Sequence, residues 1–378
     1  MKNNIENNIL ERCFGCGLCV KSCHKDAISM KKNALGFWYP SVNDKCVNCG
    51  VCLKICPASG NCKSNKLLNE TFAARLNDVE EVKKSASGGV AYSLMRYGIQ
   101  NGYIVYGAKY SDHYKKCEYH RASSSEDIQL LRGTKYSQAE LCQSIEDIRN
   151  DIANNKKVMF IGTPCYVGAV HSKYGNNSNL ILVELICSGV MPPKIEQDFF
   201  DKYRNKLKAD IDFFSVKYKK HGFEWPYVLL KCKNYKYDNP LHCTEYGYCY
   251  RSIIRECCYS CCFKGDNSKA DITIGDYWGY GKTSDVYSNK GVSAVILRND
   301  KGKDLFMKLD DVVFVETQYK CLVKNNPRIE SSRIKNKTND AFIKIYLEKG
   351  YNSAIKKTIS LKDVLLNPIK HILAIIER

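Results

Sequence analysis

Residues 13–23 read CFGCGLCVKSC and residues 46–56 read CVNCGVCLKIC, so one C-x2-C-x2-C-x3-C pattern occurs twice. Three closely spaced thiolates can bind three corners of an iron-sulfur cube, and in two-cluster ferredoxins the fourth ligand comes from the other copy. The first predicted 4Fe-4S cluster is held by Cys13, Cys16, Cys19 and Cys56, and the second by Cys46, Cys49, Cys52 and Cys23. A pair of structural zinc sites is the alternative, but zinc ribbons do not use this triple spacing twice.

The repeat also sets the first domain boundary. Residues 1–62 hold few apolar side chains, so we expect a small two-cluster 4Fe-4S ferredoxin-like domain that needs its metal to stay folded. Within it, Gly17 and Gly50 are expected to let the backbone wind tightly around each metal centre. Residues 63–84 are polar and charged, which predicts a linker, with FAARL at 72–76 as its only possible strand.

From Ser85 onward, apolar runs of strand length alternate with helical patterns, which predicts a mixed α/β or α+β body over residues 85–330. Strands are expected at 103–110, 158–162, 180–187, 227–232, 270–275, 293–298 and 312–316. Helices are expected at 90–101, 138–150 and 194–206. Residues 331–378 are predicted to be a helical C-terminal extension, whose apolar stripe packs on the body or binds weakly to a membrane surface.

Composition narrows the class of protein. The chain has 378 residues and 21 cysteines, and its start shows neither a secretion signal nor a membrane span, so we expect a cytoplasmic protein with reduced cysteines that act as ligands. The formal net charge is +18, but 40 acidic residues are present and the basic ones are scattered. This pattern does not favour binding to nucleic acid.

Several ordered motifs downstream are similar to those of one family. They are SASGGVAYSL at 85–94, GTKYSQA at 133–139, GTPCYVGAV at 162–170, ICSGVMPP at 186–193, CYSC at 258–261 and ADITIGDYWG at 270–279. In these the chain resembles the beta subunits of coenzyme F420-reducing hydrogenases and dehydrogenases, with the related hydroxymethyl-chlorophyll reductases. The resemblance implies FAD beside a 4Fe-4S cluster, behind a fused two-cluster module.

The resemblance also implies the ligands of a third 4Fe-4S cluster: Cys165, Cys187, Cys258 and Cys261. Two points stay open. Ser188 stands where the family usually has histidine, and Cys257 and Cys262 flank the C-x-x-C pair and can compete for the metal. Ordinary buried thiols are the alternative.

The sequence contains no G-x-G-x-x-G loop that would bind a flavin dinucleotide, so a Rossmann domain is not indicated. The first candidate cradle for its pyrophosphate is Ser87, Gly88 and Gly89 at a helix start, and the second is Gly133, Thr134, Lys135 and Tyr136. A turn or capping role is the alternative for each of these residues. His221 and Trp225 lie in a basic and aromatic segment, KYKKHGFEW, which is a candidate for the mouth of a site for an acidic substrate, with a solvated strand end as the alternative. Asp276 and Trp278 follow a strand and have no assigned role.

Together these features predict an iron-sulfur flavoprotein oxidoreductase of an anaerobe, which couples hydride exchange at FAD to electron transfer through 4Fe-4S clusters. Its partners would be a ferredoxin or another redox protein and a small molecule, either the deazaflavin coenzyme or a sugar-linked compound. An electron-transfer adaptor subunit without its own substrate is the main alternative. A metal-dependent regulator or scaffold is the third.

Overall fold

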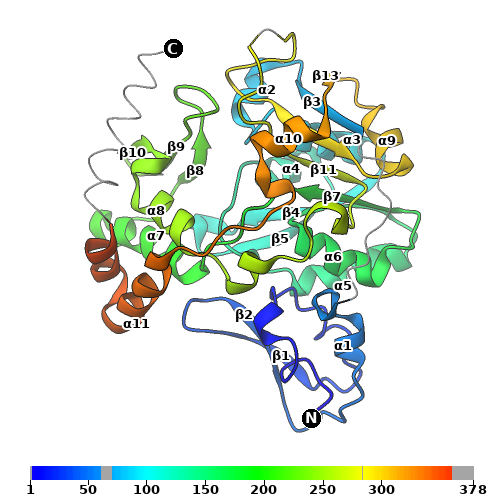
Figure 1. Ribbon diagram of the computed structural model, residues 1–378, viewed down its shortest axis with the longest axis vertical. Helices are drawn as coiled ribbons and strands as arrows, with labels where there is room; N and C mark the ends of the chain where they lie inside the picture. Colours follow the sequence, from blue (N-terminus) through cyan, green and yellow to red (C-terminus); the bar gives the residue numbers. More distant parts are fainter. Residues whose placement is uncertain (1, 61–69, 283, 360–378) are drawn as a thin grey trace.

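The computed structural model describes residues 2–60, 70–282 and 284–359. An N-terminal module lies at one end of a larger body, which contains a long mixed sheet and a smaller second sheet with its own helices (Figure 1). The fold is therefore mixed α/β with a ferredoxin-like module in front, as the sequence predicts.

The N-terminal module is built from a hairpin and short turns. Strands β1 (Ile28–Lys32) and β2 (Trp38–Val42) pair antiparallel, and the second cysteine repeat forms helix α1 (Val51–Ile55), which ends just before Cys56. The first repeat forms turns instead of a helix. Gly17 has φ +78°, as tight winding requires, but a Cβ there would lie 2.5 Å from the Cβ of Cys142. The close contact that leaves no room for a side chain at Gly17 is therefore with Cys142 of the larger body.

The central sheet has eight strands in the order β13-β3-β12-β11-β7-β6-β4-β5. Strands β11, β7, β6 and β4 run parallel to one another, and the remaining pairs are antiparallel. The strands are β3 (Glu70–Leu76), β4 (Tyr103–Tyr110), β5 (Cys117–Ala122), β6 (Lys157–Gly162), β7 (Leu180–Leu185), β11 (Ile272–Asp276), β12 (Ser293–Leu297) and β13 (Val312–Glu316). The carboxyl ends of the parallel strands β6, β7 and β11 position the candidate site described below.

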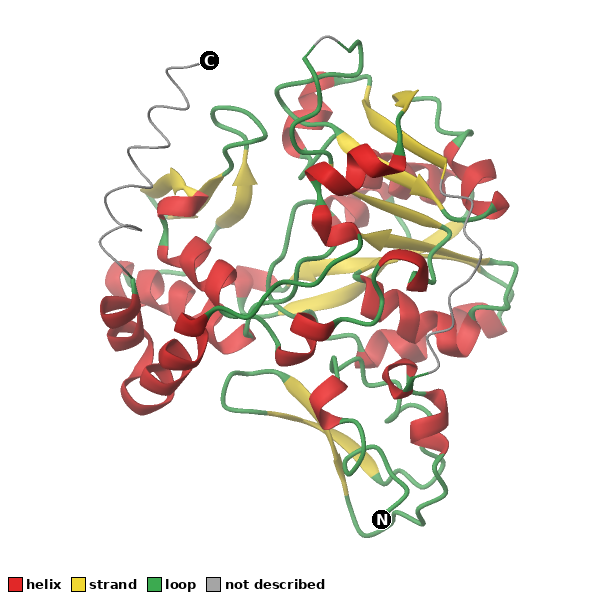
Figure 2. Cartoon of the chain, in the orientation of Figure 1, coloured by secondary structure: helices red, strands yellow, loops and turns green. Residues whose placement is uncertain are grey.

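Helices cover both faces of this sheet (Figure 2). One buried core joins the sheet to α3 (Val90–Gln100), α4 (Ser125–Leu131) and α9 (Asp300–Phe306), and also contains Val82 of α2 (Val79–Lys84). The other joins it to α5 (Cys142–Ala153) and α6 (Pro164–Tyr174), and continues into the N-terminal module through residues such as Leu18 and Phe14. The module therefore shares a hydrophobic core with the body.

A second sheet, in the order β10-β9-β8, forms an aromatic-rich unit with three helices. Its elements are α7 (Pro193–Leu207), β8 (Phe213–Tyr218), β9 (Tyr227–Cys232), β10 (Tyr235–Pro240), α8 (Glu245–Ser252) and α11 (Lys337–Thr358). The last helix of the body, α10 (Tyr319–Asn325), packs near the far edge of the central sheet, where Leu322 joins Ala73 and Ala294 in a small core.

Three expectations about boundaries need correction or remain open. The predicted linker at 63–84 is too long, because β3 pairs with both β12 and β13 inside the central sheet and α2 follows it. The helix expected from Gln138 begins at Cys142. Helix α11 lies in the predicted C-terminal extension, whereas the apolar stretch 361–378 lies outside the described residues.

Among the helices that the structure describes, none has the length and apolarity to cross a membrane.

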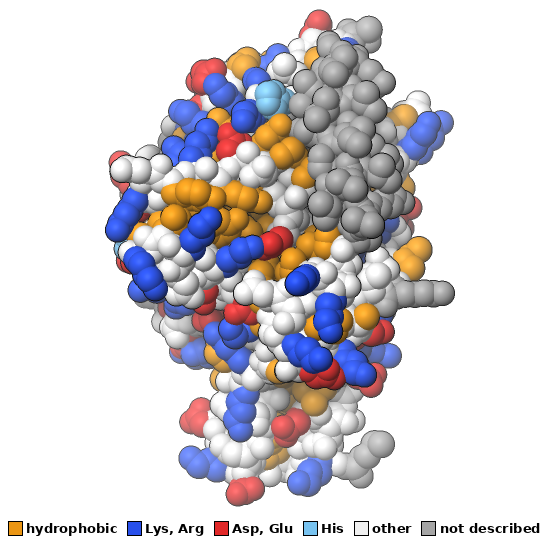
Figure 3. All heavy atoms as spheres, turned by 90° about the vertical axis from the view of Figure 1, so that its left-hand side faces the viewer, with side chains coloured by type: hydrophobic (Ala, Val, Ile, Leu, Met, Phe, Trp, Pro, Cys, Tyr) orange, Lys and Arg blue, Asp and Glu red, His pale blue; other side chains and the backbone are white. Residues whose placement is uncertain are grey.

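Charged side chains are distributed broadly. On the face formed by α7, α8 and α11, lysine and arginine side chains are interspersed with acidic ones around a band of hydrophobic residues (Figure 3). Among the described residues visible on this face, the basic side chains form no continuous track of the kind that nucleic-acid backbones bind (Figure 3).

Candidate functional site

A cavity of about 860 Å³ lies at the carboxyl ends of the parallel strands β6, β7 and β11. The start of α3, the loop at 131–139, the start of α6, the loop after β7 and parts of the second sheet unit line it. In an open sheet with parallel strands, this edge is where ligands usually bind. The cavity is therefore the leading candidate for the cofactor and substrate site.

The cavity contains all four cysteines predicted to hold the third cluster. Cys165 lies in the first turn of α6, Cys187 follows β7, and Cys258 and Cys261 belong to the turn near 256–261. Burial raises the pKa of the Cys165 thiol, and the neighbouring thiols of the other three raise it further. Four mutually close thiols from three separate segments form a donor set that fits a 4Fe-4S cluster.

The two competing cysteines are placed differently. Neither Cys257 nor Cys262 lines the cavity, although Cys257 hydrogen-bonds to Cys258. Cys257 instead lies near Tyr39 of the N-terminal module: burial raises the pKa of this tyrosine, Arg255 opposes the shift, and the neighbouring Cys257 adds to it. The geometry thus favours the predicted pair, Cys258 and Cys261, as the cavity ligands.

Ser188, which stands where the sequence resemblance implies a histidine, is part of an aromatic and cationic wall. Its hydroxyl lies 2.5 Å from the hydroxyl of Tyr250, whose ring stacks on Tyr136 with the centroids 3.6 Å apart. Arg333 donates a hydrogen bond to Ser188 Oγ at 3.3 Å and lies 4.4 Å above the Tyr250 ring. The serine therefore orients neighbours rather than supplying a nitrogen donor.

The predicted first flavin cradle is only partly in the cavity. Ser87 and Gly89 line it, and Gly89 is the N-cap of α3, without a side chain that caps the helix. Gly88 does not line it, because its N–H donates to Ser293 Oγ and a Cβ there would lie 2.5 Å from the backbone oxygen of Ala74. Free backbone N–H groups at the start of an eleven-residue helix fit a phosphate group.

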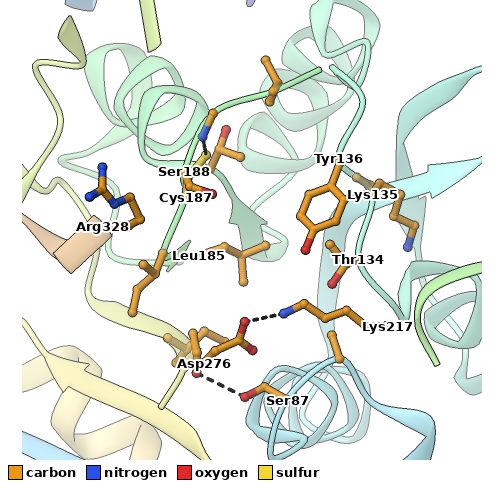
Figure 4. Close-up of a pocket in the computed structure, with 18 of the residues that line it drawn as sticks. Ser87, Thr134, Lys135, Tyr136, Leu185, Cys187, Ser188, Lys217, Asp276 and Arg328 are labelled. Carbon is orange, nitrogen blue, oxygen red and sulfur yellow. Dashed lines mark hydrogen bonds and ion pairs between the residues drawn. The ribbon is translucent and has the colours of Figure 1, made fainter. Parts of the chain in front are cut away.

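The second predicted cradle, Gly133 to Tyr136, lines the cavity in full. A Cβ on Gly133 would meet no atom within 4 Å, so open space lies beside its backbone. Lys135 points away from the centre of the site (Figure 4), and its ammonium donates to the carbonyl oxygens of Leu131 and Arg132 at 2.8 and 2.7 Å. Burial lowers the pKa of Lys135 to about 8. This lysine therefore holds the end of α4, and a direct contact with phosphate is not its present role.

Sequence reasoning missed an ion pair at the cavity wall. Lys217 of β8 pairs with Asp276 at the end of β11, as Figure 4 shows, and Trp278 stacks on Phe223 with the centroids 4.5 Å apart. Asp276, Trp278 and Lys217 all line the cavity, whereas His221 and Trp225 do not. The only sequence signal for Lys217 is its place in the basic segment before His221, and its partner is 59 positions away.

Basic side chains also surround the cysteine end of the cavity. Lys264 donates to the carbonyl oxygens of Cys187 and Arg328, and its charge lowers the pKa of the Cys187 thiol against the larger effect of burial. Positive charge at this position would stabilise an anionic cluster.

In the N-terminal module, the first predicted ligand set comes together. Burial raises the pKa of the Cys16 thiol, and Cys19, Cys56 and Cys13 raise it further, so all four lie close to one another. For the second set, Cys52 and Cys46 are neighbours, and Cys49 is exposed at the surface. Within the described ranges, no three Cys, His, Asp or Glu side chains are arranged to hold a single metal ion.

The duplicated cysteine module and the α/β body define an iron-sulfur electron-transfer protein of the oxidoreductase type. Residues 12–59 match the model of the 4Fe-4S dicluster domain, and residues 155–320 match that of the C terminus of the coenzyme F420 hydrogenase/dehydrogenase beta subunit. The chain thus carries the C-terminal domain of the coenzyme F420 hydrogenase/dehydrogenase beta subunit family behind a ferredoxin-type module, as the motifs predicted.

Comparison with curated proteins gives no match. Solved structures similar to this chain include one of the F420-reducing [NiFe] hydrogenase complex from Methanosarcina barkeri, determined in a xenon derivatization study. The two chains are 19% identical with a TM-score of 0.47, over 78% of this chain and 91% of the other.

Proposed function

We propose that this protein is an iron-sulfur flavoprotein oxidoreductase that exchanges a hydride at FAD and moves single electrons through three 4Fe-4S clusters. One observation carries the proposal: four cysteines from three separate segments and residues of both predicted phosphate cradles line the same cavity. A bound flavin supplies the conversion between a two-electron hydride and single electrons. The protein fixes the distances between the cofactors, their order along the electron path and the charge around them.

The start of α3 is the proposed binding place for the flavin pyrophosphate. Ser87 and Gly89 bring backbone N–H groups to the cavity, and Arg132 lies beside them with its guanidinium 3.9 Å from the Tyr92 ring. Arg132 is held there by hydrogen bonds to Glu81 and Ser85 Oγ. A helix N-terminus next to a fixed arginine favours a doubly charged phosphate group.

The small-molecule substrate is proposed to be anionic. The cavity wall away from α3 carries Arg251, Lys264, Arg328 and Arg333, whereas among the described residues the acidic side chains that line the cavity are Glu224 and Asp276 alone. Asp276 is already paired with Lys217. The deazaflavin coenzyme and a sugar-linked phosphate compound both fit this charge, and the former is named in the description of the family.

The proposed protein partner is a ferredoxin or a similar redox protein that binds at the N-terminal module. Cys49, a proposed ligand of the second cluster, is exposed there and would place that cluster near the surface. Reduced thiolate ligands of this number fit an anaerobic cytoplasm.

Anaerobic purification tests the proposal directly. We expect about twelve irons and twelve acid-labile sulfides per chain, together with extractable FAD. Reduced deazaflavin coenzyme, and reduced nicotinamide as a comparison, would then be added to the isolated protein, and bleaching of the flavin absorbance followed. Flavin without any response to these donors would favour the adaptor subunit, and zinc in place of iron would overturn the proposal.

A further inference from the structure

Arg255 is the most completely buried large side chain at the junction between the N-terminal module and the body, with 0% exposure. Its Nε donates to the carbonyl oxygen of Cys13 at 2.8 Å, and a terminal nitrogen donates to that of Trp38 at 2.8 Å. The other terminal nitrogen donates to Gln138 Oε1 in the body at 3.0 Å. Gln138 in turn donates to the carbonyl oxygen of Phe14 at 2.8 Å. One side chain thus fixes the module to the body.

The backbone of Arg255 reaches the cavity cysteines. Its carbonyl oxygen accepts the N–H of Cys258 at 2.9 Å, and its N–H donates to the carbonyl oxygen of Val190 at 3.0 Å. Cys258 lines the cavity, and Cys13 belongs to the first N-terminal ligand set. A single residue with two hydrogen bonds therefore joins a ligand of the proposed cavity cluster to a ligand of the first cluster.

The charge of Arg255 gives a second, independent indication. All three acceptors of its guanidinium are neutral oxygens, and in the described part of the chain no carboxylate forms an ion pair with it. Its other neighbours are the rings of Tyr39 and Phe37, at 4.2 and 5.0 Å. A guanidinium is always protonated, and a buried cation without a counter-charge is strongly destabilising. Anionic iron-sulfur clusters on both sides would supply that counter-charge.

We propose that Arg255 is the positioning residue that connects the cavity cluster to the first N-terminal cluster, and that electrons leave the cavity along Cys258, Arg255 and Cys13. This inference rests on the proposed function. With both clusters bound, each step would oxidise the cluster held by Cys258 by one electron and reduce the cluster held by Cys13 by one electron. No bond forms or breaks, and the guanidinium keeps its proton.

The charge and the geometry of Arg255 make separate predictions. Arg255→Met removes both, so the reduction potential of the first cluster should fall while that of the second cluster, farther away, stays unchanged. Arg255→Lys keeps the charge but cannot hold three acceptors in one plane, so the potential should be kept while transfer slows. Arg298→Lys is the matched control, because Arg298 is 1% exposed and directly follows β12, where it donates to the Thr273 hydroxyl.

The experiment uses the full chain with all its cofactors, after iron and flavin have been counted in every variant. Illumination with EDTA reduces the bound flavin without any substrate, and freeze-quench EPR follows reduction of the N-terminal clusters. Both Arg255 variants should transfer electrons measurably more slowly than the parent, because the guanidinium would no longer hold the module and the body at a fixed separation. Arg298→Lys should transfer at the parent rate.

Two results would overturn the inference. The first is electron transfer at the parent rate, with an unchanged potential of the first cluster, in an Arg255→Met protein with full iron content. The second applies if Arg255→Met loses iron from the N-terminal module: electron transfer at the parent rate in Arg255→Lys would then exclude the bridging role of Arg255. A parent protein without flavin or without a third cluster would instead contradict the proposed function, before any variant is compared.

Discussion

The backbone N–H of Gly88 donates a hydrogen bond to the Ser293 hydroxyl at 2.9 Å, which turns this glycine toward the central sheet and away from the cavity. Its carbonyl oxygen accepts the N–H of Leu76 at 2.8 Å, so both backbone groups are already paired. The glycine in SASGG is thus required for packing of the helix start against β3 and β12. Its neighbours Ser87 and Gly89 are the ones that face the cavity.

This relationship predicts that a substitution at Gly133 mainly weakens flavin binding, whereas a substitution at Gly88 mainly destabilises the fold. Gly133→Leu places a side chain in the open space at the second cradle, so flavin affinity should fall by about tenfold, equal to about 1.4 kcal/mol. Because Gly133 has φ +80°, any side chain there strains the backbone, so Gly133→Ala, which carries the same strain with a smaller side chain, is the control and should lower flavin affinity less. Flavin retention during gel filtration and fluorescence titration measure this.

Gly88→Ala is the matched comparison. Its Cβ would lie 2.5 Å from Ala74 O and 2.6 Å from Ser293 N, both backbone atoms, so unfolding should become easier by about 1–3 kcal/mol. Thermal unfolding and flavin titration of Gly88→Ala, Gly133→Ala and Gly133→Leu together separate the loss of stability from the loss of flavin affinity. Normal flavin binding by Gly133→Leu would move the flavin to another part of the cavity.

The central sheet was predicted well because its strands are apolar and nearly continuous. The runs at 103–110, 158–162 and 293–298 became β4, β6 and β12 with small shifts of their ends. Strand β5 of the central sheet and strand β10 of the second sheet were missed because their sequences, CEYHRA and YKYDNP, are polar and gain their pairing only from a neighbouring strand. Linker-like polarity likewise concealed the first part of β3.

For the site, motifs with a local pattern could be predicted and long-range contacts could not. The cysteines of the third set were named by resemblance, and the structure brings them into one cavity. Arg255 and Lys217 carry no motif, because their functions depend on partners such as Cys13 and Asp276, which are 242 and 59 positions away.

The ligands of the proposed third cluster can be tested by paired cysteine substitutions. Cys261→Ser should remove about four of about twelve irons and leave the N-terminal EPR signals intact. Flavin should still be reduced by a hydride donor, but electrons should no longer reach the N-terminal clusters. Cys262→Ser is the control, since Cys262 is exposed and does not line the cavity. Equal iron loss in both variants would contradict the assignment.

Lys219 predicts a pH dependence of stability. Burial, and then the charge of Lys217, lower its pKa to about 7, while its ammonium donates to the carbonyl oxygens of Val82 and Ser87. Between pH 7 and about 10 the unfolded chain holds this proton and the folded chain does not, so this group makes stability rise with pH. Below pH 7 Lys219 is protonated in both the folded and the unfolded chain, so the free-energy cost of burying its charge does not change with pH.

The free energy of unfolding should therefore change with pH at a different rate in the parent and in Lys219→Met. The free energy of unfolding of the parent should gain about 1.4 kcal/mol per pH unit relative to the variant from pH 7 to 10. Denaturant titrations at several pH values, with Lys220→Met as an exposed neighbour, measure the difference. Parallel stability curves for the parent and Lys219→Met would show that Lys219 stays charged in the folded protein.

The outer N-terminal cluster gives the last prediction. Cys49 is exposed, so Cys49→Ser removes a proposed ligand without opening a cavity in the core. We expect the loss of about four irons, flavin content equal to that of the parent, and flavin reduction by a hydride donor at the parent rate. Transfer onward to an external ferredoxin should fail, because the cluster nearest the surface is the one removed. Cys321→Ser, at a half-buried cysteine outside all three ligand sets, should change none of these measurements. If Cys49→Ser still reduces ferredoxin at the parent rate, electrons leave from the first cluster beside Cys56, and the partner binds closer to the body.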